Sequence, residues 1–245
     1  MNLVIPIASN SRFFNIDEYG YPKPLIEING KPIIQHVIEN LTHKVSFNKI
    51  IFIVKQDECD TYHLDNTLNL LSPIDPDIIK LRSDTQGALC SVLLAVKHIN
   101  NEEPLVISNA DQFFDGGIAT QLYNFIHGNF DAACLTFNSV HPRWSYVRVD
   151  ENDCVIETAE KRPISKHAIA GLYMYKKGSD FVKYGMDSIR HGSSLDGKYF
   201  ISPVFNEFVL ANKSVGYFPV PNKSYHTFYS PQKIEEYEAQ LSRGF

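Results

Sequence analysis

The sequence predicts an α/β fold with a mostly parallel central sheet and helices on both faces. In the first half of the chain, short and continuous apolar runs alternate with stretches whose apolar residues recur at helical spacing. Such alternation is typical of parallel sheets, whose strands are buried on both faces. The chain has 245 residues, 44% of them hydrophobic, which is enough to bury one large core.

The alternation of expected strands and helices is found in the first half of the chain. Residues 2–8 read as a buried strand and residues 25–28 as a second short strand, ended by an Asn29-Gly30 turn. Pro32 then opens a helix with apolar residues at 33, 34, 37, 38 and 41. The other expected elements here are helices at about 58–71 and 87–99, and strands at 49–54, 77–81 and 104–109.

After about residue 130 strands follow one another without long helices between them. They predict an antiparallel or mixed portion that joins the same sheet. The expected strands are 131–138, 144–150, 154–161, 168–176 and 215–220, and the expected helices are about 179–190, 202–211 and from about 231. We find no repeat and no linker, so residues 1–245 are expected to form a single domain with halves of about 1–130 and 131–245.

Composition excludes several classes of function. The net charge is −5 and no basic run occurs, so a nucleic-acid groove is not expected. No apolar stretch approaches the length of a membrane span, and the N-terminal strand does not resemble a signal peptide. The four cysteines form no CxxC pair, which predicts reduced thiols and a cytoplasmic protein. The nine histidines show no zinc-binding spacing.

Two cations follow the first strand. Pro22 and Pro24 flank Lys23 and fix the backbone on both sides of it, while Arg12 lies eleven residues earlier. A planar guanidinium and a point-charge ammonium together suit a polyphosphate. The alternative is that both are ordinary surface cations.

Asp111 comes directly after the strand at 104–109. A carboxylate at the carboxyl end of a strand, opposite two cations, is a natural Mg²⁺ ligand. It is equally natural as a turn residue or a helix cap.

Several further residues are candidates for a binding site. Gly87 begins a helix, where glycine lets a ligand approach the backbone, or is an ordinary helix-start glycine. Glu160 and Lys161 are adjacent at a strand end and point to opposite faces, so one of them can face a pocket. Gly171 lies inside a strand, where glycine marks a close approach. Trp144 walls a pocket or fills the core.

Taken together, these pieces resemble the sugar-phosphate nucleotidyltransferase family, whose NTP-transferase fold is related to GT-A glycosyltransferases. The resemblance spans nearly the whole chain and keeps the order of the family's segments. Its most specific piece is the lysine between prolines followed by "INGKPII". The segments that carry it are "SRF", "YPKPLIEINGKPIIQHVIENL", "QGAL", "SNADQ", "WSYVRVDENDCVIETAEK", "AIAGLYMYKKG" and "YSPQKIEEYE". The details "IPIA", "NADQ" and "HPRWSY" look like a bacterial branch found with capsule and surface-polysaccharide genes.

The resemblance implies a reaction in which a phosphate on an acceptor attacks the α-phosphorus of an NTP and pyrophosphate leaves. The first half would bind the nucleotide, with CTP preferred through the branch resemblance, and the second half a phosphorylated small molecule or sugar 1-phosphate. Arg12 would hold the β- and γ-phosphates, Lys23 the α-phosphate and the attacking phosphate, and Asp111 the Mg²⁺ ion. The other implied contacts are Ala8, Ser9, Asn10 and Ser11 with the nucleotide, Gln86 and Gly87 with the base, and Trp144, Ser145, Glu160, Lys161 and Gly171 with the acceptor. Self-association into a homo-oligomer is left open.

Three positions depart from the family pattern. The first loop reads "ASNSRF", without the usual glycines, so its backbone cradle must differ. Ser145 stands where a glycine usually lines the sugar pocket, and Thr227 stands where a second metal-binding Asp is usual. We expect the neighbouring His226 to hydrogen-bond a metal-bound water or a phosphate oxygen; otherwise it is a surface residue before a turn.

Two other functions stay open. A GT-A-type glycosyltransferase would use a nucleotide sugar, but such enzymes generally carry a DxD metal motif and "NADQFFD" is not one. A degenerate nucleotide-binding protein that has lost the chemistry would explain the glycine-free loop and Thr227.

Overall fold

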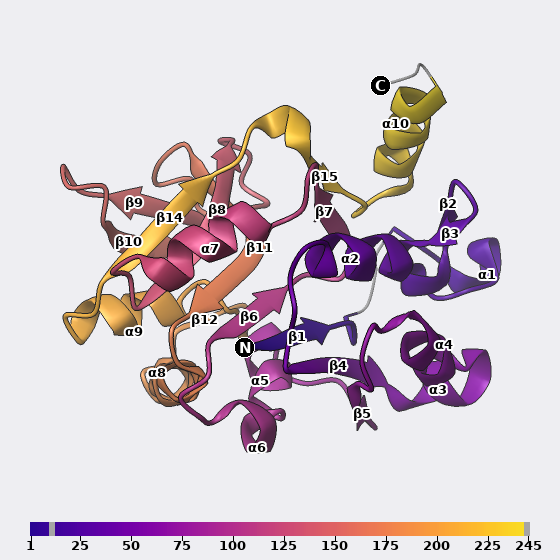
Figure 1. Ribbon diagram of the computed structural model, residues 1–245, viewed down its shortest axis with the longest axis horizontal. Coiled ribbons are helices and arrows are strands. Elements are labelled where there is room, and N and C mark those ends of the chain that lie inside the picture. Colours follow the sequence, from indigo (N-terminus) through magenta and orange to yellow (C-terminus); the bar gives the residue numbers. More distant parts are fainter. Residues whose placement is uncertain (10–12, 243–245) are drawn as a thin grey trace.

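A computed structural model describes residues 1–9 and 13–242 of the chain. Its central sheet runs in the order β5, β4, β1, β6, β11, β9, β10, and β8 and β14 extend it from β11 (Figure 1). The strands of this sheet are β1 (Asn2–Pro6), β4 (Lys49–Lys55), β5 (Asp77–Leu81), β6 (Leu105–Ser108), β8 (Ala132–Asn138), β9 (Tyr146–Val149), β10 (Val155–Ala159), β11 (His167–Tyr175) and β14 (Val215–Pro219).

Parallel pairing dominates the N-terminal half and mixed pairing the C-terminal half. β1 pairs in parallel with β4 and with β6, and β4 pairs in parallel with β5. β11 runs antiparallel to β6, β8 and β9, while β14 joins β8 in parallel. The predicted fold class, a mostly parallel sheet with mixed strands in the second half, is confirmed.

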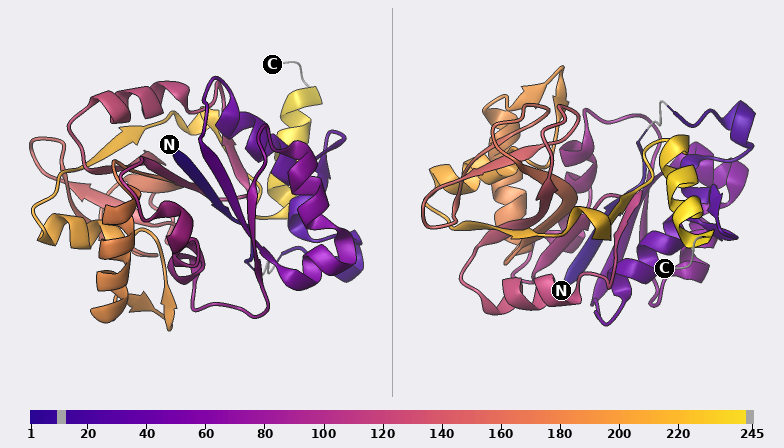
Figure 2. Two further views of the ribbon diagram at one scale, coloured as in Figure 1. Left: turned by 60° about the horizontal axis from the view of Figure 1, so that its bottom comes forward. Right: turned by 90° about the horizontal axis from the view of Figure 1, so that it is seen from above.

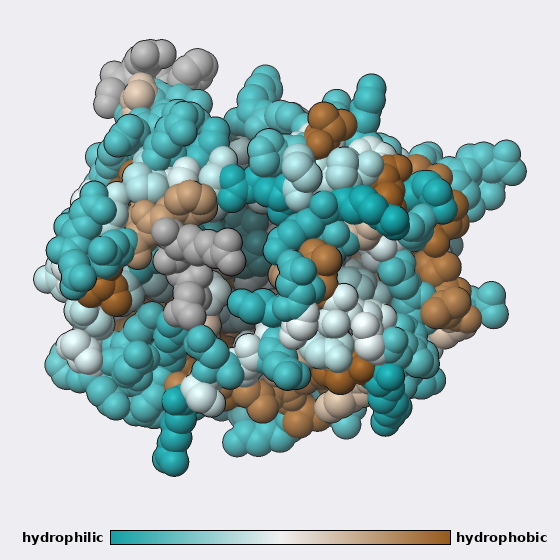
Figure 3. All heavy atoms as spheres, turned by 180° about the vertical axis from the view of Figure 1, so that it is seen from behind, coloured by the Kyte–Doolittle hydropathy of each residue, from teal (hydrophilic) through white to brown (hydrophobic). Residues whose placement is uncertain are grey.

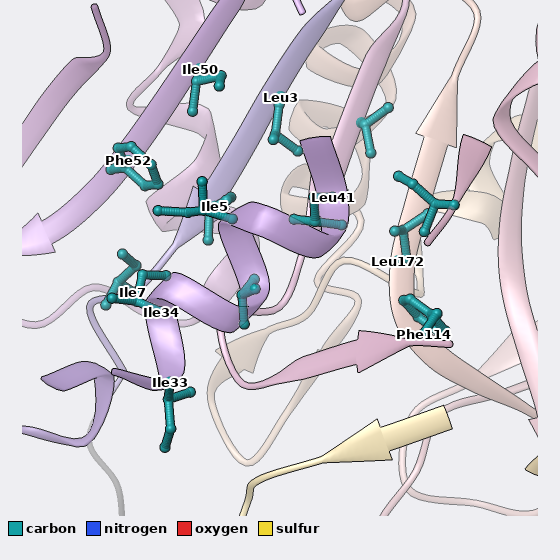
Figure 4. Packing of buried hydrophobic residues seen from close by; sticks show 14 of the residues in the cluster. Leu3, Ile5, Ile7, Ile33, Ile34, Leu41, Ile50, Phe52, Phe114 and Leu172 are labelled. Carbon is teal, nitrogen blue, oxygen red and sulfur yellow. The ribbon is translucent and has the colours of Figure 1, made fainter. Parts of the chain in front are cut away.

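Helices cover both faces of the sheet, as the side views show (Figure 2). Alternate residues of β1 enter different cores: Leu3 and Ile5 join one apolar cluster, and Val4 joins the other. The first cluster includes α2 (Ile33–Thr42), whose Ile33, Ile34 and Leu41 are buried beside the strands (Figure 4). The second cluster includes α5 (Ala88–Leu93), α6 (Val96–Ile99), α8 (Gly178–Arg190) and α9 (Val204–Leu210).

Two long helices expected from the sequence are each broken in two. The segment expected at 58–71 forms α3 (Gln56–Tyr62) and α4 (Leu64–Leu71), because His63 between them has a φ of 53°. A left-handed residue ends the first helix, since its N–H turns back to the carbonyl of Cys59. The segment expected at 87–99 divides into α5 and α6 at Leu94 and Ala95.

Other expectations need smaller corrections. β1 ends at Pro6 rather than residue 8, and the strand expected at 104–109 is Leu105–Ser108. Residues expected as a strand at 25–28 form the end of the 3₁₀ helix η1 (Lys23–Leu25) and the two-residue strand β2 (Glu27–Ile28), which pairs with β3 (Lys31–Pro32).

The structure also contains elements that the sequence did not predict. α7 (Ala119–His127) adds a helix to the first core through Leu122 and Phe125. β7 (Gln112–Phe114) pairs with β15 (Tyr225–Thr227), and β12 (Ser194–Leu195) with β13 (Lys198–Tyr199). α1 (Ile16–Tyr19) and η2 (Asn222–Ser224) were not predicted either, whereas the last helix, α10 (Pro231–Ser242), begins where the sequence predicted it.

No helix within residues 1–9 and 13–242 combines the length and apolar character that a membrane crossing needs.

Candidate functional site

The molecule is hollowed near its centre when seen from behind (Figure 3). A cavity of about 400 Å³ lies beyond the carboxyl ends of β1 and β6. In open α/β sheets this rim is where ligands bind, because loops from neighbouring strands diverge there. The lining residues come from the loops after β1 and β6, η1, the start of α5 and the end of β13: Pro6, Ile7, Ala8, Ser9, Lys23, Pro24, Asp84, Thr85, Gly87, Ala88, Ser91, Asn109, Ala110, Asp111, Lys198 and Phe200.

Lys23 and Asp111 meet at this cavity. The Lys23 ammonium forms an ion pair with a carboxylate oxygen of Asp111, and the two side chains are 18% and 25% exposed. Pro22 has an extended backbone and Pro24 is buried, so η1 holds Lys23 at a fixed place. The Lys23 ammonium also lies 5.5 Å from the ring centroid of Phe14. The structure thus brings together two residues that lie 88 positions apart in the sequence.

The loop before α5 is held against the β12–β13 hairpin. The N–H of Tyr199 donates to the carbonyl of Gln86 at 2.7 Å, and the Thr85 and Ser91 hydroxyls hydrogen-bond each other at 2.6 Å. Gly87 has a φ of 112° and a ψ of 174°, a conformation that is almost restricted to glycine. A Cβ on Gly87 would lie 2.3 Å from the carbonyl oxygen of Tyr199. Gly87 therefore serves this close backbone contact in addition to lining the cavity.

Gly87→Ala should lower the free energy of unfolding by more than about 3 kcal/mol, since backbone strain and a backbone clash combine. Gly192→Ala is the matched control: its φ is 71°, and an added Cβ would meet nothing within 4 Å. It should cost only about 1 kcal/mol. Urea denaturation of the three proteins measures both costs. Equal losses in the two variants would contradict the clash with Tyr199.

Glu160 is the centre of a polar network beside the cavity. The Ser145 hydroxyl donates to its carboxylate, and the Ser202 hydroxyl donates to the same oxygen at 2.8 Å. β10 ends one residue earlier, so Glu160 and Lys161 both follow the strand rather than end it. Lys161 has a φ of 53°, and its ammonium lies 5.0 Å from the ring centroid of Phe200, which lines the cavity. Ser145, Glu160 and Lys161 do not line the first cavity themselves, but this group adjoins it through the contact of Lys161 with Phe200.

Gly171 lies in β11, and its carbonyl accepts a hydrogen bond from the N–H of Asn109, which lines the first cavity. The φ of Gly171 is 61°, and the register between β11 and β8 shifts between Ile169 and Tyr173. A Cβ on Gly171 would lie 2.3 Å from the side-chain nitrogen of Asn109 and 2.6 Å from the side-chain oxygen of Gln112. The close approach predicted at this glycine is therefore made by the protein's own side chains.

Trp144 and His226 lie in a different place. Both line a second cavity of about 350 Å³ between β15, the loop before β9 and α10. His226 Nε2 is 2.9 Å from Asp115 Oδ1, and its ring stacks on Phe113 with centroids 4.7 Å apart. His226 is not among the described residues that line the first cavity, so its neighbours are not those expected from the sequence.

The structure leaves some of the predicted nucleotide contacts untested. Asn10, Ser11 and Arg12 lie outside the described residues. Gln86 is exposed, and its carbonyl is engaged with Tyr199. Sequence reasoning also missed lining residues, namely Asp84, Thr85, Ser91, Asn109, Lys198 and Phe200. The Asp196-Gly197 dipeptide, a hairpin signal, could have indicated the β12–β13 hairpin that brings Lys198 there.

The side chains at the first cavity suit a Mg²⁺ ion that a nucleotide would share. No group of three or more His, Cys, Asp and Glu side chains placed to hold a metal lies within residues 1–9 and 13–242. Mg²⁺ in nucleotide sites needs only one or two carboxylates, with phosphates and water as the other ligands. Asp111, partly exposed at the strand end, is a donor of this kind. The donor set fits a shared site and not an all-protein cage.

Sequence comparison finds distant relatives among known proteins. "Bifunctional protein GlmU" from Methanococcus aeolicus is 27% identical over 180 residues, which cover 71% of this chain and 39% of that protein. "D-glycero-alpha-D-manno-heptose 1-phosphate guanylyltransferase" from Campylobacter jejuni is 31% identical over 161 residues, covering 64% of this chain and 67% of that protein.

Among solved structures, a nucleoside-diphosphate-sugar pyrophosphorylase from Vibrio cholerae superposes with a TM-score of 0.85 and 21% identity. The superposition covers 97% of this chain and 100% of that one, and it shows the shared fold. The pattern of the MobA-like NTP transferase domain matches residues 9–178, a stretch that contains Lys23, Gly87, Asp111, Glu160 and Gly171. On this match, which extends over more than half of its length, the chain belongs to the MobA-like NTP transferase family.

Proposed function

We propose that this protein is a Mg²⁺-dependent nucleotidyltransferase that couples an NTP to a phosphorylated small metabolite or a sugar 1-phosphate. The observation that carries the proposal is the Lys23–Asp111 pair at a cavity beyond β1 and β6. A fixed ammonium and a carboxylate at one point are what a phosphate and its metal counter-ion require. Family membership and the relatives' printed names support the same reaction class.

In the proposed reaction an oxygen of the acceptor phosphate attacks the α-phosphorus of the NTP. The bond from the α-phosphorus to the bridging oxygen of the β-phosphate breaks, and pyrophosphate leaves. An acceptor phosphate is already ionised near pH 7, so no general base has to remove a proton. Catalysis therefore rests on alignment and on neutralisation of charge.

Different residues of the chain would carry out the alignment and the neutralisation of charge. In the proposed reaction the Lys23 ammonium leaves Asp111 and pairs with the α-phosphate and the attacking phosphate. Because the backbone at Lys23 is fixed, the ammonium holds these two groups near each other. Asp111 would hold Mg²⁺, which supplies positive charge to the phosphates when bound. Glu160, oriented by the Ser145 and Ser202 hydroxyls, would accept a hydrogen bond from an acceptor hydroxyl or amide.

CTP and a role in capsule or surface-polysaccharide synthesis are the finer parts of the proposal. They rest on the branch resemblance of "IPIA", "NADQ" and "HPRWSY", within which a cytidylyltransferase acting on phosphoglutamine is a candidate. The C. jejuni relative, by its printed name, uses a guanine nucleotide and a heptose 1-phosphate. GTP and sugar phosphates therefore belong in the same test.

The test measures pyrophosphate release with Mg²⁺ and each of CTP, UTP, GTP, ATP and dTTP. Phosphoglutamine, heptose 1-phosphate and hexose 1-phosphates are added in turn. We expect release that depends on an acceptor and is fastest with CTP. Cleavage of a nucleotide sugar without pyrophosphate would instead indicate a glycosyltransferase. Binding of an NTP without any release would indicate a degenerate binding protein.

A further inference from the structure

The second cavity lies between the acceptor half and α10. Figure 1 shows α10 beside β7 and β15, and Tyr237 of α10 packs against Phe113 and His226 with ring centroids 5.1 Å from each. Aromatic side chains make up much of its wall. Of the side chains that line it, Lys233 is paired with Glu236 on α10, and His226 Nε2 lies 2.9 Å from Asp115 Oδ1.

Among the described residues, Lys223 and Arg143 are the cations of this cavity without an ion pair, and of the two Arg143 lies against aromatic rings. Its guanidinium carbon lies 3.1 Å from the ring centroid of Tyr229 and 5.1 Å from that of Trp144. No carboxylate lies within ion-pair distance of Arg143 in the part of the chain that the structure describes. A guanidinium stacked on rings keeps its in-plane N–H groups free, and these match the two oxygens of a carboxylate.

The second cavity adjoins the Lys23–Asp111 pair through β15. The Phe228 N–H donates to the carbonyl of Asp111 at 2.7 Å, and the Tyr225 hydroxyl donates to Gln112 Oε1 at 3.0 Å. Burial chiefly, and then the Asp111 carboxylate, raise the pKa of the Tyr225 hydroxyl, whereas the Arg143 guanidinium lowers it. Tyr225, which lines the second cavity, is thus linked by its hydrogen bond to Gln112, the residue after Asp111.

We propose that Arg143 binds a carboxylate of the phosphorylated acceptor in the second cavity, an inference that rests on the proposed nucleotidyl transfer. The acceptor phosphate would lie at Lys23, the Glu160 network would contact the middle of the molecule, and its carboxylate would reach Arg143. The sugar part of a hexose 1-phosphate is neutral, so once the phosphate lies at Lys23 the molecule has no second anionic group for the guanidinium. The substrate class is therefore a phosphorylated acid.

The chain contains a single tryptophan, Trp144, and it touches Arg143. Its fluorescence therefore reports on this cavity without any turnover. We would titrate the protein with glucuronic acid 1-phosphate and with glucose 1-phosphate, which differ only in the carboxylate. We expect a dissociation constant at least tenfold lower for the acid, and the same preference in kcat/KM with the best NTP.

Arg143→Gln should remove the preference and leave the affinity for glucose 1-phosphate within twofold, and Arg143→Lys should restore part of it. Arg148→Gln is the matched control, because Arg148 is 55% exposed and already paired with Glu157. Equal affinities for the two probes in the unaltered protein would overturn the proposal. An equal loss of affinity for both probes in Arg143→Gln would also overturn the proposal, because it would indicate that Arg143 only packs against Tyr229.

The proposed function can fail separately. If no NTP yields pyrophosphate with any acceptor, yet Trp144 reports a carboxylate preference that depends on Arg143, the binding site stands and nucleotidyl transfer does not. If pyrophosphate forms equally well with both probes, transfer stands and the role of Arg143 does not.

Discussion

Lys23→Ala should lower kcat/KM for pyrophosphate release by about 10²–10³-fold, the range seen when one preorganised electrostatic group is removed. Alanine keeps the backbone between Pro22 and Pro24 but removes the charge that the α-phosphate and the attacking phosphate would share. The fold should persist, because Asp111 is 25% exposed and water can solvate it when the ion pair is lost. Steady-state kinetics and urea denaturation of the same preparation measure both effects.

The structure offers a matched control for this variant. Lys80 and Asp65 form a second Lys–Asp pair, with side chains 35% and 21% exposed, on β5 and α4. Lys80→Ala removes a comparable ion pair that does not line the first cavity. Its activity should stay within twofold of the unaltered protein. Near-normal turnover by Lys23→Ala would remove Lys23 from the proposed mechanism.

Asp111→Asn should abolish the dependence on Mg²⁺ concentration together with most of the activity, about 10²-fold or more. Asparagine has nearly the same shape, and the backbone carbonyl of residue 111 can still accept from the Phe228 N–H. The loss would therefore come from the carboxylate charge. Mg²⁺ titrations of the unaltered protein and of the variant, each ended by excess EDTA, measure it.

Asp65→Asn is the corresponding control, since it makes the same change in the Lys80–Asp65 ion pair. Its Mg²⁺ titration should match that of the unaltered protein. Full activity of the unaltered protein in excess EDTA would reduce Asp111 to a structural partner of Lys23.

Local sequence signals located the elements that bear the first cavity. The strands at 49–54 and 77–81 were predicted almost residue for residue, because continuous apolar runs between polar boundaries have few alternatives. Lys23 and Asp111 were predicted to face each other, since both follow strands of one parallel sheet. The helix breaks at His63 and Ala95 were missed, because neither residue is a usual helix breaker.

The rest of the site depends on contacts between distant parts of the chain. His226 pairs across β15 and β7 with Phe113, and no local pattern indicates that pairing. As a result the sequence placed His226 near the metal, whereas the structure gives it Asp115 as a partner. Ser202 reaches Glu160 from 42 positions away, and Arg143 gains its aromatic neighbour Tyr229 only when the C-terminal segment packs. Side-chain contacts of this kind, between residues far apart in the sequence, form only in the complete fold.

The Lys23–Asp111 ion pair has a consequence for which ligands the proposed site would bind. The two charges neutralise each other. A phosphate that binds Lys23 without a metal ion would therefore have to break the ion pair and leave the Asp111 carboxylate without a counter-charge. A lone divalent cation would likewise leave an ammonium without one. An NTP that arrives with its metal supplies an anion for Lys23 and a cation for Asp111 in one step, so one ion pair is exchanged for two. If Lys23 and Asp111 bind as proposed, the pair would therefore disfavour a free inorganic anion or a free cation and favour the metal–nucleotide complex.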